Sequence, residues 1–379
     1  MQREEYSRRD LLVGGVAGLG AAVGLGVSRP AEAVQTAPKV EGNLAWYNVE
    51  AWGVEGRGWT DTARYFDRFP ALAEKTIPGS VWNLSRHSAG MLVRFETSAG
   101  EIHARYTLRS PNLALPHMPA TGVSGLDLYG RDRRGRDRWL GVVLPGAQRV
   151  QARLAGGLDA VSDEGGRTYT IYLPLYNGLD ELEIGVPREA RFRGLAPRRD
   201  KPLVFYGTSI MHGACASRTG MSITGILGRR FRKPVINLGF SGNGRMDTGV
   251  VSLLAELDPA VYAIDCLPNM TPEMVAERTE PLVRALRAAR PDTPILLVED
   301  RTFTNSPFLE GTRRSHTARR AAFRRAYDQL IGSGVKGLAY LPGDRILGED
   351  GEGATDGSHP NDLGMVRYAD AYEPALRRL

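Results

Sequence analysis

A serine, a histidine and an aspartate stand in this chain where they could form a nucleophilic centre. Ser209 follows the apolar run 203–206 and the turn residue Gly207, which predicts a serine at the C-terminal end of a buried strand. Open α/β sheets bind their ligands at that end. Serine attacks a carbonyl only when a base takes its proton, so a catalytic Ser209 requires a histidine nearby. The alternative is an ordinary strand-to-helix loop in which Ser209 caps the helix.

The segment 356–360 supplies the best candidate base. Asp356 precedes His359 by three residues in a glycine-containing turn, just before the last predicted helix. An aspartate in that position can fix the tautomer of the imidazole and stabilise its charged form. The alternative is a solvated turn that starts a helix. His212, three residues after Ser209, is the rival base; with no aspartate near it in sequence, it is expected rather to line the substrate pocket.

Two further segments offer donors for the oxyanion that acyl transfer creates. The segment 237–244 follows a predicted strand, and its glycines allow backbone N–H groups to approach a ligand closely. The segment 264–270 follows the next predicted strand, where the amide of Asn269 could donate. The alternatives are a loop whose glycines serve turn geometry and an asparagine in a turn that starts a helix.

From residue 201 onward, apolar strands alternate with helical patterns, which predicts a parallel sheet with helices on both faces. The domain is expected to span residues 201–379. Strands are predicted at 203–206, 235–238, 261–265, 295–298 and 338–340, and helices at 221–231, 249–257, 272–289, 317–331 and 361–378.

Residues 42–197 have a different pattern, in which short runs of strand-forming residues are separated by Gly, Pro, Asn and Asp. This pattern predicts a β-sandwich or jelly roll. Strands are predicted at 80–84, 91–97, 102–108, 126–129, 139–143, 168–173 and 181–184. The long proline-rich segment 111–124 carries His117 and is predicted to lie over the catalytic cleft and to contact the acyl acceptor; a purely structural role is the alternative. The arginine-rich connector 188–201 marks the predicted domain boundary.

Residues 1–33 resemble a twin-arginine export signal. Arg8 and Arg9 precede a Gly/Ala-rich apolar stretch, and Ala31-Glu32-Ala33 is a small-x-small cleavage site. The rival reading, a membrane anchor, is disfavoured because the stretch is short and weakly hydrophobic. The mature protein is therefore expected to start near Val34, outside the cytoplasm and without a membrane span.

Composition excludes several other classes. The net charge of +6 comes from 49 basic and 43 acidic residues, but no basic run interleaved with aromatics indicates nucleic-acid binding. Cys215 and Cys266 have no metal-ligand spacing around them, so no metal is expected. Both cysteines are expected to be free buried thiols, with a disulfide as the alternative. His316 opens a basic helix and is expected to be exposed.

The order of these segments resembles the four sequence blocks of the SGNH (GDSL-type) hydrolases. Segments 206–210, 241–243, 268–270 and 356–359 match the blocks in order, although Thr208 stands where the family usually has aspartate and Asn269 is not followed by one. The resemblance implies a flavodoxin-like α/β/α hydrolase domain and an esterase that needs no metal or other cofactor. It also implies a Ser209–His359–Asp356 triad, with the oxyanion held by Ser209, Gly242 and Asn269. The amino-acid sequences of the blocks resemble those of a subgroup that has an extra N-terminal β-domain.

For an exported esterase with a β-domain, the predicted substrate is a short-chain, acetyl-type ester on carbohydrate. The substrate-pocket candidates are Thr208, His212 and His117. Two alternatives stay open: a lipase or phospholipase, and a carbohydrate-binding protein whose hydrolase domain is inactive.

Overall fold

A five-stranded parallel sheet forms the centre of the C-terminal half of the computed structural model, which describes residues 33–34, 37–159 and 166–379. Its strands are β12 (Leu203–Gly207), β13 (Val235–Gly239), β14 (Val261–Asp265), β15 (Ile295–Val298) and β16 (Leu338–Leu341). They are ordered β13-β12-β14-β15-β16, which is 2-1-3-4-5 in chain order, as in flavodoxin-like sheets. The strand order reverses between β12 and β14, and such a switch point is where ligands bind in open α/β sheets.

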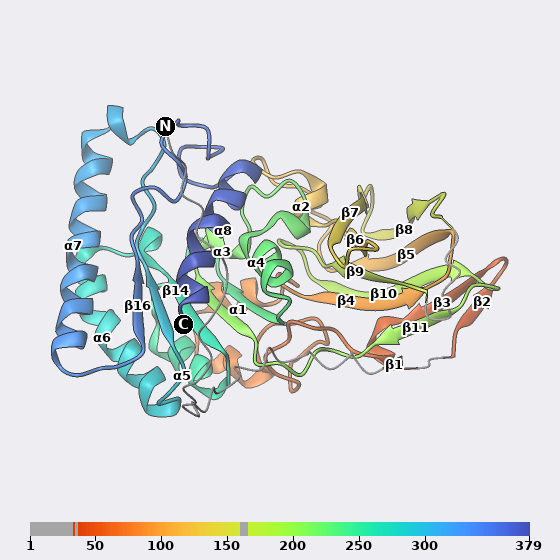
Figure 1. The fold of residues 1–379 in the computed structure, drawn as a ribbon, viewed down its shortest axis with the longest axis horizontal. Helices are drawn as coiled ribbons and strands as arrows, with labels where there is room; N and C mark the ends of the chain where they lie inside the picture. Colours follow the sequence, from red (N-terminus) through yellow and green to blue (C-terminus); the bar gives the residue numbers. More distant parts are fainter. Residues whose placement is uncertain (1–32, 35–36, 160–165) are drawn as a thin grey trace, which may run out of the picture. The chain divides into compact units, whose positions relative to one another are not determined.

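Helices cover both faces of this sheet because its strands are apolar on both sides, as parallel strands must be. Val204 and Tyr206 pack toward one core, and Leu203 and Phe205 toward the other. Figure 1 shows α6 and α7 on one side of the sheet and α4 and α8 on the other. The predicted parallel α/β arrangement is confirmed. The helices are α3 (Ser209–His212), α4 (Ile223–Phe231), α5 (Thr248–Glu256), α6 (Pro272–Ala289), α7 (Glu310–Gly332) and α8 (Asp362–Arg377).

Two antiparallel sheets that share one apolar core make up most of the N-terminal half. The first has the order β1 (Ala33–Val34), β11 (Phe192–Leu195), β4 (Leu92–Thr97), β9 (Arg167–Tyr172), β6 (Asp127–Arg131) and β7 (Asp137–Val142). The second has the order β2 (Lys39–Glu41), β3 (Leu44–Asn48), β10 (Leu179–Pro187), β5 (Glu101–Leu108) and β8 (Arg149–Gly156). The mainly antiparallel half is as expected, while jelly-roll connectivity stays a prediction.

The predicted strand at 80–84 is wrong, because this segment is the helix α1 (Gly79–Ser85). Pro78 and Gly79 start the helix, and Val81, Trp82 and Ser85 are buried at helical spacing. The N-terminal half is therefore not all β; it also contains α2 (Ala120–Val123) and the 3₁₀ turns η1 (Val49–Ala51) and η2 (Ala71–Lys75).

The proposed export signal lies almost entirely outside the described residues. Ala33 and Val34, on either side of the expected cleavage point, pair with Leu195 and Gly194 of β11. Strand β11 itself lies inside the predicted connector 188–201. Among the described residues, no helix has the length and apolarity needed to cross a bilayer. The domain boundary stays a prediction, since residues 31–379 form one compact unit.

Candidate active site

Ser209, His359 and Asp356 lie in one hydrogen-bonded line. Ser209 is the first residue of α3, directly after β12, and its Oγ lies 2.8 Å from Nε2 of His359. Nδ1 of His359 lies 2.7 Å from Oδ2 of Asp356. The carboxylate requires the proton on Nδ1, which leaves Nε2 free to accept the hydroxyl proton. The hydroxyl thus faces a base that is held by a carboxylate.

The turn that carries Asp356 fixes its carboxylate by several hydrogen bonds. The backbone N–H groups of Ser358 and His359 donate to Oδ1 of Asp356 at 3.0 and 2.8 Å. Partial burial raises the pKa of Asp356, but the backbone and ring N–H groups of His359 outweigh it and lower the pKa to about 2. Asp356 is therefore ionised at neutral pH, as an orienting carboxylate must be. Gly357 allows this turn, because its φ of +85° lies in the left-handed region.

Three loops meet at the C-terminal ends of β12, β13 and β14. Phe240 donates its backbone N–H to the carbonyl of Gly207 at 3.0 Å. The amide Nδ2 of Asn269 donates to the backbone carbonyl of Asn243 at 2.7 Å, beside Gly242. Gly242 has a φ of +68°, so a glycine suits the turn. The amide of Asn269 carries two hydrogens, and the bond to Asn243 uses one of them. The structure thus brings Ser209, Gly242 and Asn269 to one edge of the sheet.

The two pocket candidates next to Ser209 have other positions than expected. Thr208 is fully buried, and its hydroxyl caps α3 by accepting from the N–H of Ile210 at 3.4 Å. His212 is also fully buried, and its ring stacks on Tyr176 with centroids 4.1 Å apart. Both side chains are enclosed in the protein interior, so the prediction that they line the substrate pocket is wrong. His212 is also not the residue that meets the hydroxyl of Ser209.

His117 reaches the site from the N-terminal half. Its ring lies 6.0 Å from that of His359, centroid to centroid, and its side chain is exposed. The neighbouring Met118 is buried, and the backbone of Leu115 and Met118 closes a small turn with two hydrogen bonds. The segment 111–124 therefore brings His117 close to His359, while its contact with the acyl acceptor stays a prediction.

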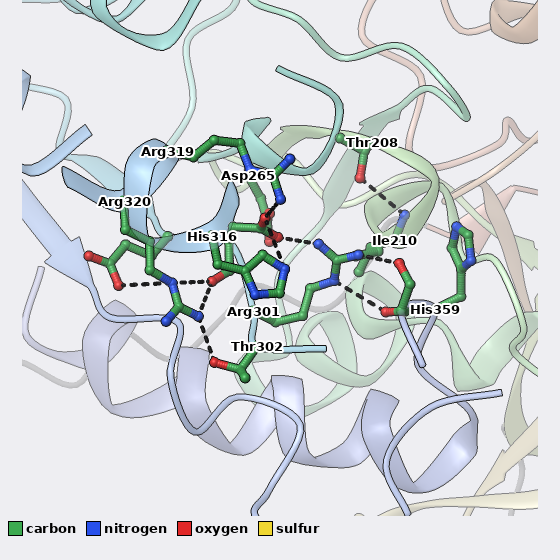
Figure 2. Close-up of polar contacts among 12 residues, drawn as sticks. Thr208, Ile210, Asp265, Arg301, Thr302, His316, Arg319, Arg320 and His359 are labelled. Carbon is green, nitrogen blue, oxygen red and sulfur yellow. Dashed lines mark hydrogen bonds and ion pairs between the residues drawn. The ribbon is translucent and has the colours of Figure 1, made fainter. Parts of the chain in front are cut away.

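A buried charge cluster behind the turn that carries Asp356 and His359 was not predicted from the sequence. Arg301, just after β15, donates to the backbone carbonyl and the hydroxyl of Ser358, the residue before His359. Arg301 also pairs with the buried Asp300, to which Arg319 donates at 2.5 Å. Figure 2 shows Arg301 between this cluster and the segment that carries His359. Polar residues directly after a buried strand were the available signal in the sequence.

His316 belongs to this cluster, so its predicted exposure is wrong. Its side chain is buried, and its ring packs against Phe303 with centroids 4.6 Å apart. Burial lowers the pKa of His316 to about 4, although Asp300 opposes that shift. The basic helix α7 turns His316 toward the interior together with Arg319, which pairs with Asp300, while Arg314 on the same turn of the helix is exposed.

Asp265, at the end of β14, should make stability depend on pH. Burial raises its pKa from an ordinary value of 3.8 to about 7, although the hydroxyl of Tyr372, 2.6 Å away, and the charge of Arg301 lower it. Between about pH 4 and 7, the folded protein holds a proton that the unfolded chain has released, so stability falls as the pH rises through this window. Asp265→Asn removes the effect. As the pH is raised from 5 to 8, the melting temperature of Asp265→Asn should rise relative to that of the wild type. A difference that stays constant with pH would contradict this.

A polar contact between the two halves was also missed. Oδ2 of the buried Asp127 accepts from Arg218 at 2.7 Å and from the backbone N–H of Gly220 at 2.9 Å. Arg218 also donates to the hydroxyl of Tyr129 at 2.6 Å. The adjacent Ser217 donates its N–H and hydroxyl to Asp362, at 2.9 and 2.5 Å, at the start of α8. The segment 217–220 therefore joins the N-terminal half to the helix that follows His359.

The two cysteines are free and buried, as expected. Cys215 lies in the loop after α3, and Cys266 follows β14. In the part of the chain that the structure describes, no group of His, Cys, Asp and Glu side chains could hold a metal ion.

Comparisons with known proteins give the family of this chain. Residues 200–377 match the model of the GDSL-like lipase/acylhydrolase family, and residues 44–192 match a model, named GxDLY, for the N-terminus of SGNH-hydrolase-type esterases. A crystal structure from Bacteroides ovatus, described as a GDSL-like lipase, is 33% identical, with a TM-score of 0.83; the alignment covers 89% of this chain and 98% of that one. The chain therefore belongs to the GDSL-like lipase/acylhydrolase family. It is a carboxylic ester hydrolase.

More distant structures share the fold. A salicylyl-acyltransferase from a tetracycline biosynthetic pathway is 17% identical with a TM-score of 0.66, covering 92% of this chain and 97% of its own. An acetyl xylan esterase from the rumen bacterium Butyrivibrio proteoclasticus is 10% identical with a TM-score of 0.54, covering 89% and 98%. No curated protein matches the chain significantly.

The name GxDLY describes a motif that this chain contains. Gly125-Leu126-Asp127-Leu128-Tyr129 has this pattern, and its aspartate and tyrosine are the two residues that hold Arg218. The motif therefore contacts the C-terminal half. The glycine fits because a Cβ at Gly125 would lie 2.5 Å from the carbonyl oxygen of Thr121.

Proposed function

We propose that this protein is a serine esterase that removes short acyl groups by way of an acyl-enzyme on Ser209. The observation that carries the proposal is the hydrogen-bonded line in which Oγ of Ser209 lies 2.8 Å from His359 and His359 lies 2.7 Å from Asp356. A serine becomes a nucleophile when a positioned base accepts its proton, and a carboxylate behind the base stabilises the imidazolium that forms.

The proposed reaction has two halves. Nε2 of His359 takes the proton of Ser209 while Oγ attacks the ester carbonyl, and the same nitrogen then returns that proton to the departing alcohol. Water attacks the acyl-enzyme with His359 again as base, which releases the acid and frees Ser209. The backbone N–H groups of Ser209 and Gly242 and the second amide hydrogen of Asn269 are the proposed donors to the oxyanion.

The proposed substrate is an acetyl-type ester on carbohydrate. Support comes from the exposed ring of His117, which offers a polar and partly apolar surface beside His359, and from the acetyl xylan esterase that shares this fold. Because an acyltransferase has the same fold, transfer to an acceptor other than water is the alternative. Rates on acetylated oligosaccharides and on simple esters of increasing chain length would test the proposal. Faster turnover of long-chain lipid esters would overturn it.

His117→Ala should slow hydrolysis of an acetylated polysaccharide about tenfold while changing the rate on a small chromogenic acetate less than twofold. The reason is that only a large acceptor extends from Ser209 to the loop that carries His117, and one lost contact of this kind costs about 1–2 kcal/mol. His103→Ala is the matched control, since His103 lies on β5 beside Glu101. Equal losses on both substrates would assign His117 a structural role instead.

We also propose that the protein is exported. Arg8 and Arg9, together with Ala31-Glu32-Ala33, support a cleaved twin-arginine signal. N-terminal sequencing of protein from the native host should find a start near Val34. An intact N-terminus on a cytoplasmic protein would contradict the export signal.

A further inference from the structure

Arg68 is a fully buried cation that binds backbone carbonyls. Its side chain comes from the N-terminal half, and its guanidinium donates to the carbonyl of Asn237 at 3.1 Å and to that of Gly239 at 2.8 Å. It also donates to the carbonyls of Leu84 and His87, at 2.6 and 3.0 Å. Two of the four carbonyls therefore belong to β13, the strand that leads into the loop with Gly242.

The charge of Arg68 has no direct counter-ion among the described residues. The adjacent Asp67 is instead engaged by Arg86, at 2.7 Å. Burial lowers the pKa of Arg68 only to about 9, so it remains charged at neutral pH. Burial also lowers the pKa of its neighbour His87 to about 3, which leaves that ring neutral. A buried, unpaired charge is costly and is retained where it serves a purpose.

The guanidinium lies beside the start of the loop that carries Gly242. Its carbon lies 4.7 Å from the ring centre of Phe240, two residues before Gly242. On its other side, Arg68 lies 3.5 Å from Nε2 of His212, whose ring stacks on Tyr176. The hydroxyl of Tyr176 donates in turn to the backbone carbonyl of Ser209 at 3.3 Å. Arg68 is thus joined, through β13 and through His212 and Tyr176, to both sides of the proposed oxyanion site, while its own side chain stays fully buried.

We propose that Arg68 is a positioning residue for the oxyanion site, one that fixes the end of β13 and places a permanent positive charge under the point where the substrate carbonyl becomes negative. The inference rests on the proposed function. In a site shielded from water, a fixed charge acts on the transition state without reorganising, so it should affect kcat rather than KM. The N-terminal half would then contribute to the chemistry as well as to acceptor binding.

The test compares two substitutions at Arg68 on a small chromogenic acetate. Arg68→Gln should lower kcat about 30-fold and change KM less than twofold, and Arg68→Lys, which keeps the charge, should recover at least half of that loss on a logarithmic scale. Arg287→Gln is the matched control. Arg287 also donates to four carbonyls, those of Arg290, Pro291, Thr293 and Gly337, at the opposite edge of the sheet, so its loss should lower stability but not kcat.

A second pair of variants works even if Arg68→Gln does not fold. His87→Glu would place a negative charge beside Arg68 and should lower kcat about tenfold, while the neutral His87→Gln should not. An unchanged kcat in Arg68→Gln or, if that variant does not fold, in His87→Glu would overturn the inference, and so would a loss in Arg68→Lys as large as in Arg68→Gln. Failure of the proposed function itself would look different, because Ser209→Ala would then keep the activity of the wild type.

Discussion

An organophosphonate should label the wild-type protein at Ser209, and His359→Ala should abolish this labelling. The hydroxyl is unreactive until Nε2 of His359, 2.8 Å away, accepts its proton. Loss of such a base removes most of the catalytic advantage, so kcat on a chromogenic ester should fall by about 10⁴–10⁶ in His359→Ala and in Ser209→Ala alike. Intact-mass measurement after labelling and steady-state kinetics on the same preparations give both readouts.

His212→Ala provides the control for this experiment. His212 faces Arg68 and Tyr176 rather than the hydroxyl, and burial, followed by the charge of Arg68, lowers its pKa well below the usual value. The variant should therefore still be labelled, although the lost packing should lower its melting temperature. Labelling that survives in His359→Ala and disappears in His212→Ala would reverse the assignment of the base.

Asn269→Ala should lower kcat by about 10²–10³ and leave KM nearly unchanged. A donor to the oxyanion meets negative charge that exists only in the transition state, and removing one such donor costs about 3–4 kcal/mol of activation free energy. The same substitution removes the hydrogen bond to the carbonyl of Asn243, so a modest loss of stability is expected in addition. Activity at saturating substrate and the melting temperature should be measured on the same sample.

The structure supplies a control that separates catalysis from helix capping. The side chain that caps α6 is Thr271, which accepts from the N–H of Met274 at 3.3 Å; Asn269 is not the cap. Thr271→Ala should therefore cost about 1 kcal/mol of stability with kcat unchanged. If Asn269→Ala behaved in the same way as Thr271→Ala, the backbone N–H groups of Ser209 and Gly242 would have to stabilise the oxyanion alone.

The parallel sheet was predictable because its strands are buried on both faces. The predicted bounds of 261–265 and 295–298 agree with β14 and β15, since continuous apolar runs leave little doubt about where a strand ends. Strand β8 was missed because it alternates toward solvent and carries Arg149, Gln151 and Arg153. Helix α1 was mistaken for a strand because seven residues are too few to show a helical period clearly.

Part of the proposed reacting centre was predictable from local spacing. Asp356 and His359 lie three residues apart, so their contact is local and visible in the sequence. Arg68 and Asp127 could not be found in this way, because their partners in the C-terminal half lie more than 90 residues away and sequence spacing gives no information on such contacts. Thr208 and His212 were misjudged because position next to a nucleophile does not reveal which way the following turn points a side chain.

The contact between Asp127 and Arg218 has a thermodynamic consequence. Separating the two halves would expose a buried carboxylate and an arginine that now satisfy each other, and would leave the carbonyls of β13 without Arg68. Because of these contacts, we expect the two halves to unfold together. Calorimetry should therefore record one unfolding transition with equal van't Hoff and calorimetric enthalpies. A fragment starting at residue 198 would consequently be a poor way to ask what the β-rich half does. Point substitutions in the intact chain are the appropriate tool.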